Sequence, residues 1–256
     1  QALAGPVTLR VQTRAQIDAA LAQQQLDLVI THPGHAVELQ QARVVGNPIA
    51  TRLVRDPQAG PGTEALGAFG GVIFALESPQ APRTLADLRQ ARVAAPDTHW
   101  LGAYQMQSHE MLQQGLEPPH GARLLQVGGN QWAVVEAVLS GRAAAGFVRT
   151  GVLEAMAAEG RVELTRLRVL AAKQWPRFPY RVSTRLVPGW PAVLNPALGA
   201  AQGARIGAAL LALPAHAVPQ LPGFTIPADY SEVTEVLKAN RAAPFKNVSQ
   251  TLLQEL

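Results

Sequence analysis

The sequence predicts an α/β fold, because short apolar runs alternate with helical patterns along most of its 256 residues. The first part opens with a strand over 7–11, a helix over 15–24 and a second strand over 26–30. The same order returns later, with a strand over 144–148 and a helix over 152–159. Hydrophobic residues make up 48% of the chain and charged residues 16%, the balance of a globular protein. We therefore expect parallel strands joined by crossover helices.

Turn and capping residues mark the next elements. Strands are expected over 49–54 and 72–76, because the intervening residues 57–62 are rich in proline and glycine. The segment Thr84-Leu85-Ala86-Asp87 resembles a capping box and predicts a short helix, which leads into a strand over 92–95. These elements start a second series of strand, turn and helix.

The remaining elements follow the same signals. Gly141 is placed to end a helix as its C′ residue, and a passage rich in Pro and Trp over 175–191 indicates that the chain crosses back. Helices are expected over 99–114, 131–140, 203–213 and 230–240, and extended segments over 124–127, 169–172 and 180–186.

Composition and charge exclude several classes of protein. The formal net charge is +4 and the 22 Lys and Arg residues are scattered, whereas nucleic-acid-binding proteins concentrate cations in runs or on one face. The chain has no cysteine, which excludes thiol nucleophiles, zinc ribbons and disulfide frameworks. The most apolar window, 206–218, has about 13 residues and contains Pro214, whereas a membrane-spanning helix needs about 20. We expect no nucleic-acid partner and no spanning segment in this chain.

Catalytic signatures are missing from the sequence. It contains no G-x-x-x-x-G-K-[ST] loop and no G-x-S-x-G motif, and His109-Glu110 lacks the second histidine of H-E-x-x-H. We therefore expect a non-catalytic domain without a cofactor or a metal.

Polar residues and glycines follow the predicted strands. In open α/β sheets, ligands collect at the carboxyl ends of strands, where helix N-termini present unpaired N–H groups. The residues at such positions are Thr31, His32, Thr98, His99, Trp100, Gly129, Asn130, Arg149 and Thr150. Arg149 can offer a bidentate fork to a carboxylate or another oxyanion, and its alternative role is a structural ion pair with Glu154. Tyr180, where the chain returns towards its first part, is a further candidate.

Structural roles are open alternatives for some of these residues. Thr31 and Thr98 would serve equally well as helix N-caps. His32 and His35 suit a turn and a core position better than a metal site, because no third ligand lies nearby in the sequence.

Several stretches together carry a family resemblance that covers nearly the whole chain. They are the strand-T-x-P-G-H pattern over 28–35, "TLADLR", "VLSGRAAAGFVRTGVLEAMAAEG" over 138–160, "STRLVPGWP" over 183–191 and "IPADYSEVTEVL" over 226–237. The sequence resembles the PhnD-like superfamily of periplasmic solute-binding proteins. Within it, "VRTGVLE" and "DYSEV" look most like the periplasmic sensor domains of bacterial histidine kinases of the tetrathionate-sensor type.

The resemblance implies a two-lobed type II periplasmic binding protein fold with a hinge between the lobes. Lobe 1 would comprise 1–78, without the first strand-helix unit of the family, and a return segment over 178–256, whereas 79–177 would form lobe 2. Closure of the hinge would couple ligand binding to signalling. The implied setting is periplasmic, with membrane contact through segments of a parent protein outside this chain, and it is compatible with a homodimer of a kinase sensor.

In this scheme Thr31, His32 and Tyr180 contact a small anionic or polar ligand from lobe 1, and the other candidates contact it from lobe 2. The ligand is not carried over from the family, because His32 stands where an amide is common and "PDTHWLGAY" replaces a smaller loop. A free receptor for an ABC importer is the first alternative function. An enzyme that uses His32 or His99 as its base is the second.

Overall fold

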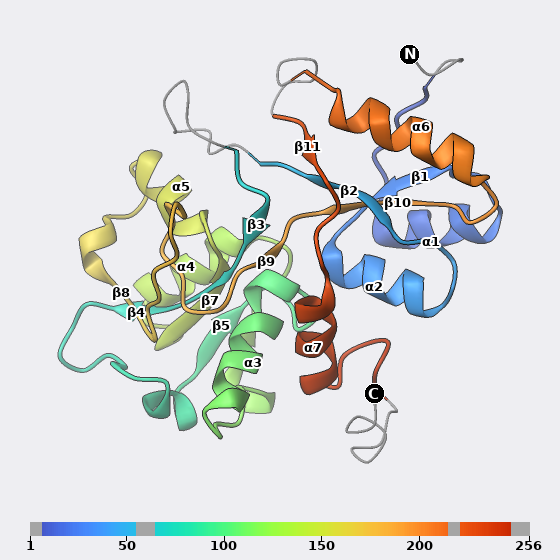
Figure 1. Ribbon diagram of the computed structural model, residues 1–256. Coiled ribbons are helices and arrows are strands. Elements are labelled where there is room, and N and C mark those ends of the chain that lie inside the picture. The colour runs from blue at the N-terminus through green and yellow to red at the C-terminus, as the bar shows by residue number, and fades with distance from the viewer. Residues whose placement is uncertain (1–6, 55–64, 215–220, 247–256) are drawn as a thin grey trace. The chain divides into compact units, whose positions relative to one another are not determined.

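The structure is a computed structural model that describes residues 7–54, 65–214 and 221–246. It divides the chain into two compact units, between which the chain passes at Ala68/Phe69, Val187/Pro188 and Thr234/Glu235. Unit 1 comprises Gln1–Ala68 and Pro188–Thr234, and unit 2 comprises Phe69–Val187 and Glu235–Leu256. Figure 1 shows their helices and strands, and each unit is described by itself below.

Unit 1 contains a four-stranded sheet with the order β1-β10-β2-β11. Its strands are β1 (Leu28–Ile30), β10 (Pro191–Leu194), β2 (Pro48–Arg52) and β11 (Phe224–Thr225). Its helices are α1 (Arg14–Ala22), α2 (Pro33–Gln41) and α6 (Ala200–Leu211). Because β10 runs antiparallel to both β1 and β2, the carboxyl ends of β1 and β2 lie at the same edge of the sheet.

The core of unit 1 has two layers, one on each side of the sheet. Val29 of β1 packs with Leu21 of α1 and Leu39 of α2 on one side. On the other side, Leu28 and Ile30 pack in the cluster that includes Leu210 of α6. The alternation along β1 therefore follows the two-residue period of a strand buried on both faces.

Unit 2 contains a five-stranded sheet with the order β6-β5-β7-β4-β8. Its strands are β6 (Leu124–Gln126), β5 (Val93–Ala95), β7 (Ala145–Arg149), β4 (Gly71–Leu76) and β8 (Leu167–Val169). Its α-helices are α3 (Gln105–Gln113), α4 (Gln131–Leu139) and α5 (Val152–Ala158), with the 3-10 turns η1 (Ala86–Arg89), η2 (Leu101–Ala103), η3 (Gly121–Arg123) and η4 (Leu164–Arg166). Strand β5 is parallel to β6 and β7, whereas β4 is antiparallel to β7 and β8.

Two elements lie where the chain passes between the units. Strands β3 (Ala68–Phe69) and β9 (Val187–Pro188) form a two-stranded sheet, and helix α7 (Ser231–Ala239) runs across the third crossing. Among the residues that the structure describes, no helix has the length and the apolar character needed to span a membrane.

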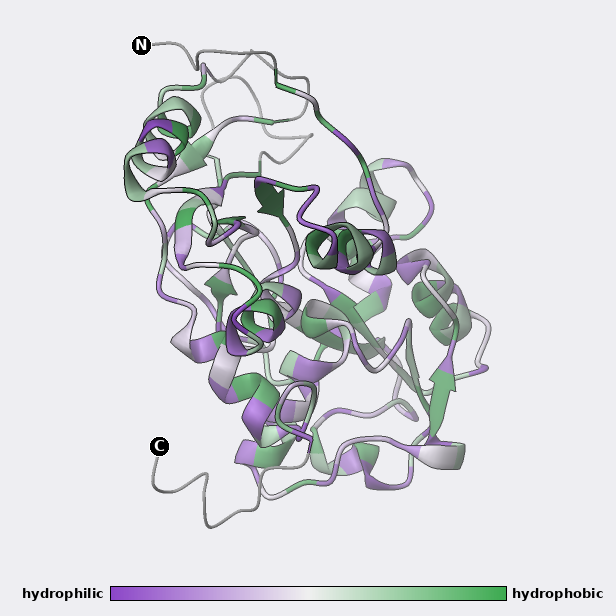
Figure 2. Ribbon diagram, turned by 90° about the vertical axis from the view of Figure 1, so that its right-hand side faces the viewer, coloured by the Kyte–Doolittle hydropathy of each residue, from purple (hydrophilic) through white to green (hydrophobic). Residues whose placement is uncertain are grey.

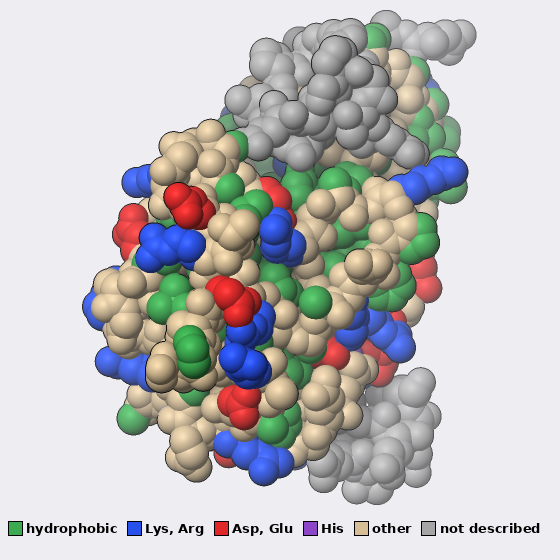
Figure 3. Space-filling view, turned by 90° about the vertical axis from the view of Figure 1, so that its left-hand side faces the viewer, with side chains coloured by type: hydrophobic (Ala, Val, Ile, Leu, Met, Phe, Trp, Pro, Cys, Tyr) green, Lys and Arg blue, Asp and Glu red, His purple; other side chains and the backbone are tan. Residues whose placement is uncertain are grey.

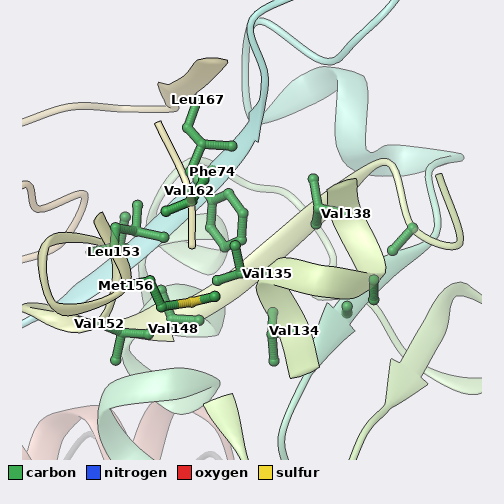
Figure 4. Close-up of a cluster of buried hydrophobic side chains, with 14 residues drawn as sticks. Phe74, Val134, Val135, Val138, Val148, Val152, Leu153, Met156, Val162 and Leu167 are labelled. Carbon is green, nitrogen blue, oxygen red and sulfur yellow. The ribbon is translucent and has the colours of Figure 1, made fainter. Parts of the chain in front are cut away.

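The core of unit 2 is also double-sided. Phe74 and Val148 point to the α4 and α5 side, where they pack with Val135 and Met156 (Figure 4). A Cβ atom on Gly146 of β7 would lie 2.6 Å from the Phe74 ring, so this glycine makes room for the phenylalanine.

The surface carries both kinds of charge. Figure 3 shows basic side chains interspersed with acidic ones on the face that it displays. Figure 2 shows helices with mixed hydropathy around hydrophobic strands.

The structure confirms the predicted α/β class and most predicted elements, with four corrections. The sheets are not purely parallel as expected, because neighbouring strands in unit 1 are antiparallel and β4 in unit 2 is antiparallel to β7 and β8. Residues 7–11 do not form a strand, and Val7, Leu9 and Val11 are 74%, 82% and 97% exposed because no described strand pairs with them. The helix predicted over 99–114 is interrupted at Tyr104, whose φ of −155° separates η2 from α3. Extended residues 180–186 form a single bridge, Lys173 to Val182, instead of a strand.

The units also begin and end at other residues than the predicted lobes. The chain enters unit 2 at Phe69, ahead of residue 79 where lobe 2 was expected to begin, because β4 pairs with β7 and β8. It returns to unit 1 at Pro188 instead of near 178, and residues 235–256 belong to unit 2.

Candidate ligand-binding site

The carboxyl ends of β5 and β6 bring two predicted ligand loops together in unit 2. The N–H of Val127 donates to the carbonyl of Ala95 (3.0 Å), and the N–H of Gly128 donates to that of Pro96 (3.0 Å). A Cβ atom on Gly129 would lie 3.9 Å from Cζ2 of Trp100, so the indole lies against the glycine. Trp100 is 36% exposed, which leaves part of its ring available to a ligand.

The loop after β5 is held by Asp97. The N–H of His99 donates to Asp97 Oδ1 (2.8 Å), and His99 Nδ1 lies 2.6 Å from the same oxygen. The hydrogen bond from this N–H lowers the pKa of the Asp97 carboxyl. His99 is exposed, so a ligand can reach its ring from solvent.

Strand β7 ends next to the same loops. Arg149 is its last residue and is half-buried. A Cβ atom on Gly102 would lie 3.0 Å from Arg149 Cγ, so η2 passes directly along the arginine side chain. Glu154, the structural partner considered for Arg149, lies 3.6 Å from Nη1 of Arg181 and accepts its N–H (2.9 Å).

Three other candidates in unit 2 have identifiable structural roles. Asn130 is the N-cap of α4, and its Oδ1 accepts the N–H of Trp132 (2.9 Å). Thr150 is buried, and its Oγ1 accepts the N–H of Gly70 (3.1 Å). Thr98 offers its carbonyl to Gln105 Nε2 (3.0 Å). These contacts fix the loops. A role of the three residues in ligand binding stays a prediction.

Tyr180 lies in unit 2, whereas it was expected to act from lobe 1. Its ring is 3.5 Å from the position that a Cβ on Gly151 would take, and Gly151 has a φ of +86° that favours glycine. Phe178 packs edge-on against it with the ring centroids 5.6 Å apart. Tyr180 therefore lies beside Gly151, close to the end of β7. It belongs to unit 2 because the chain returns to unit 1 only at Pro188.

Sequence analysis missed three glutamines that hold these strand ends. Gln107 is fully buried, and its Nε2 donates to the carbonyls of Gly102 and Val148 (2.9 Å each). Gln131 Oε1 accepts the N–H of Arg149 (2.7 Å), and Gln105 supports Thr98. The sequence carries no signal for Gln105 and Gln107, because α3 opens with the mostly polar residues QMQSHE, which are nevertheless largely buried.

In unit 1, Thr31 follows β1 and its hydroxyl is part of a buried relay. Thr31 Oγ1 lies 2.9 Å from His35 Nδ1, and His35 Nε2 lies 2.7 Å from Asp18 Oδ1. A carboxylate can only accept, so the proton of a neutral His35 ring is on Nε2 and the Thr31 hydroxyl donates to Nδ1. The structure thus gives His35 the core role considered for it.

His32 is the residue that caps α2, a role that was considered for Thr31. Its Nδ1 accepts the N–H of Gly34 (3.2 Å), and Pro33 occupies the first position of the helix. Among the described residues, no group of three His, Asp or Glu side chains is placed to hold a metal ion. Thr31 and His32 remain predicted ligand contacts at this edge of unit 1.

The chain matches a known protein family over nearly its whole length. A family model described as "ABC transporter, phosphonate, periplasmic substrate-binding protein" matches residues 1–253. No curated protein matches the chain.

Solved structures show the same fold at low sequence identity. XAC2383 from Xanthomonas citri bound to ATP is 19% identical over 90% of this chain and 84% of its own, with a TM-score of 0.65. A binding protein component of an ABC phosphonate transporter from Pseudomonas aeruginosa is 14% identical over 94% and 82%, with a TM-score of 0.62. PhnD1 from Prochlorococcus marinus in complex with methylphosphonate is 15% identical over 90% and 84%, with a TM-score of 0.55. The predicted type II periplasmic binding protein fold is confirmed.

Proposed function

Because the chain belongs to the family of periplasmic substrate-binding proteins of phosphonate ABC transporters, we propose that it recognises a small oxyanion at the strand ends of unit 2. The domain is a periplasmic solute-binding domain of the PhnD type and is not an enzyme.

One observation carries the proposal: three adjacent strands of unit 2 end at one edge, each followed by a polar or glycine-rich loop. The order β6-β5-β7, with β5 parallel to both neighbours, aligns the loops after Ala95, Gln126 and Arg149. Helix α4 begins at this edge and directs its N-terminal partial positive charge towards it. Arg149 adds a full charge and a bidentate donor fork, which together suit an oxyanion.

A thermal-shift and calorimetric screen tests the ligand class. The panel comprises methylphosphonate, short alkyl sulfonates, inorganic phosphate, sulfate and small carboxylates. At about 100 times its dissociation constant, a ligand that binds the folded state adds about 2.7 kcal/mol of stability, which raises the melting temperature by a few degrees. Absence of any response across the panel would contradict the proposed ligand class.

Arg149→Gln tests the role of the arginine. Loss of a charge-assisted hydrogen-bonding partner should weaken binding of the responding anion by about 1.5–3 kcal/mol. The matched control is Arg142→Gln, which removes the same charge from an exposed residue after α4 in the same unit. Equal affinities of the two variants would remove Arg149 from the site.

We also propose that binding serves signalling, with the chain acting as the extracytoplasmic sensor of a membrane-bound histidine kinase. The "VRTGVLE" and "DYSEV" stretches support this purpose. The alternative, delivery of the ligand to an ABC importer, is supported by the description of the family and by the transporter component from Pseudomonas aeruginosa. The gene separates them: kinase motifs after Leu256 establish the sensor, and a stop codon there together with a neighbouring permease gene establishes the receptor.

A further inference from the structure

Trp100, in the loop that follows β5 of unit 2, has a backbone that hydrogen bonds fix on both sides. Its N–H donates to the carbonyl of Asp97 (3.2 Å), and its carbonyl accepts the N–H groups of Tyr104 (3.0 Å) and Gln105 (3.1 Å). Trp100 also stands directly before η2, and its extended backbone starts that turn. The indole is therefore attached at a fixed position, which lowers the entropic cost of holding the ring against a ligand.

The loop after β6 lies beside this ring without adding a side chain. A Cβ atom on Gly129 would lie 3.9 Å from Trp100 Cζ2, which is an ordinary van der Waals distance. Among the described residues, no atom beyond its chain neighbours would lie within 4 Å of a Cβ atom on Gly128, so this position faces open space. The two glycines therefore leave room next to the indole at the carboxyl ends of β5 and β6.

The exposure of Trp100 differs from that of the tryptophan in α4. Trp132 is half-buried, and the guanidinium carbon of Arg161 lies 4.4 Å from its ring centroid, so a cation already stacks on that indole. Trp100 is 36% exposed, which leaves a flat apolar surface in contact with solvent at the strand ends. Small-molecule sites use such aromatic surfaces for the organic part of a ligand and a few polar groups for its orientation.

One short turn of unit 2 connects Trp100 to Arg149 at the end of β7. Turn η2 starts directly after Trp100, and a Cβ atom on its residue Gly102 would lie 3.0 Å from Arg149 Cγ. The indole and the proposed anion contact are thus positioned by the same three residues, 100–102. A ligand that binds Arg149 through its oxyanion therefore has Trp100 at the same group of loops for its organic part.

We propose that Trp100 determines the specificity of this site and selects oxyanions that carry a planar aromatic group, such as aryl phosphonates and aryl sulfonates. This inference rests on the proposed function and adds to it the class of organic group that the same site binds. Two aromatic rings in offset or edge-on contact attract each other beyond the gain from their buried area. An inorganic oxyanion or an alkyl phosphonate has no ring that uses the indole in this way.

Calorimetric titration with three phosphonates tests the selection. Phenylphosphonate should bind about three- to tenfold more tightly than cyclohexylphosphonate, which has a similar size but no planar ring, and methylphosphonate should bind most weakly. Trp100→Ala should abolish the preference for phenyl over cyclohexyl, and Trp100→Phe should keep part of it because an aromatic ring remains. The control Leu112→Ala removes an exposed apolar side chain from α3 of the same unit and should leave the preference unchanged. Melting temperatures of the free variants show that each is folded.

The outcomes separate this inference from the proposed function. Silence of the unaltered domain towards the oxyanion panel and all three phosphonates contradicts both. Equal affinities for the three phosphonates, each weakened by Arg149→Gln, support the proposed function and overturn the selection by Trp100. Equal affinities for the phenyl and cyclohexyl compounds, or a phenyl preference that survives in Trp100→Ala, overturn it as well. A phenyl preference that is lost in Trp100→Ala and partly kept in Trp100→Phe supports it.

Discussion

The two units hold their strand ends by different chemistry. In unit 2, uncharged amides of Gln105, Gln107 and Gln131 bind backbone groups of the loops that follow β5 and β7. In unit 1, titratable side chains hold the equivalent threonines: His35 with Asp18 holds Thr31, and Tyr230 holds Thr51. The strand ends of unit 2 are thus held largely by amides, with Asp97 as an acidic contact in the loop after β5, whereas those of unit 1 are held by an imidazole, a carboxylate and a phenol.

The difference also affects which groups remain for a ligand. In unit 2, the N–H groups of Val127 and Gly128 donate to the carbonyls of Ala95 and Pro96, so the loops after β5 and β6 are tied to each other. In unit 1, the hydroxyls of Thr31 and Thr51 are engaged by His35 and Tyr230. The predicted ligand contacts of unit 1 therefore have side-chain partners, whereas the loops of unit 2 are fixed through backbone groups.

The largest expected effect is loss of the amide that joins η2 to β7. Gln107→Leu keeps a similar volume but removes the buried donor of the Gly102 carbonyl and the second donor of the Val148 carbonyl, which also pairs with β4. One unpaired buried group costs about 1–3 kcal/mol, so we expect the free energy of unfolding to fall by about 2 kcal/mol. Urea denaturation measures it, with the exposed Gln113→Leu on the same helix as the control.

A result for Gln107→Leu within about 0.5 kcal/mol of the control would mean that the loops of unit 2 are held by other contacts. The comparison between the units would then lose its basis in unit 2. Gly71 provides a second check, because a Cβ there would lie 2.6 Å from Gln107 Cδ. Gly71→Ala should therefore displace the same amide and destabilise the domain by about 1–3 kcal/mol.

A middle-sized effect is expected from the relay in unit 1. Asp18→Asn removes the charged acceptor of His35 Nε2, and we expect a loss of about 1 kcal/mol because the carboxylate is 46% exposed. The substitution also removes the group that keeps the proton on Nε2, so nitrogen NMR of His35 should show a changed tautomer population. The control is Asp27→Asn in the same unit. An unchanged His35 spectrum would show that Asp18 does not set the tautomer.

The sequence predicted the parts of this molecule whose signals are local. The apolar run of 72–76 is strand β4 and that of 144–148 is β7, since both lie in the middle of a sheet with both faces buried. The loops after Ala95 and Gln126 were located by the same reasoning, because a polar cluster directly after an apolar run marks a strand end.

Contacts between distant residues were beyond the reach of the sequence. Gln107 binds Val148, 41 positions away, and nothing in either residue's neighbours signals the other. Residues 7–11 alternate like a strand, yet alternation does not supply the neighbouring strand that must pair with it. The contact of Arg52 with Trp190 likewise depends on β10, which brings two residues far apart in the sequence together.

An effect of similar size at neutral pH, and a test of the titratable group with a clear pH signature, is expected from Tyr230. Its hydroxyl donates to the Gly189 carbonyl (2.9 Å) and lies 3.1 Å from Thr51 Oγ1, so Tyr230→Phe should cost about 1 kcal/mol. Burial raises the pKa of Tyr230 to about 12, whereas an exposed tyrosine titrates near 10. Between these values the unfolded chain binds fewer protons than the folded one, so the free energy of unfolding falls as pH rises.

That loss of stability should begin near pH 10 and end near pH 12, and it should be smaller in Tyr230→Phe, which has no phenolic proton to lose. Burial also raises the pKa of Tyr104 in unit 2. Tyr104→Phe is therefore the matched variant, and it measures how much of the alkaline loss of stability comes from unit 2. Urea denaturation at intervals from pH 8 to about 11.5 measures both curves. If Tyr230→Phe keeps the full alkaline loss, the hydroxyl network does not confer pH dependence on unit 1. If its curve flattens, the strand ends of unit 1 are held by a group whose protonation the folded structure controls.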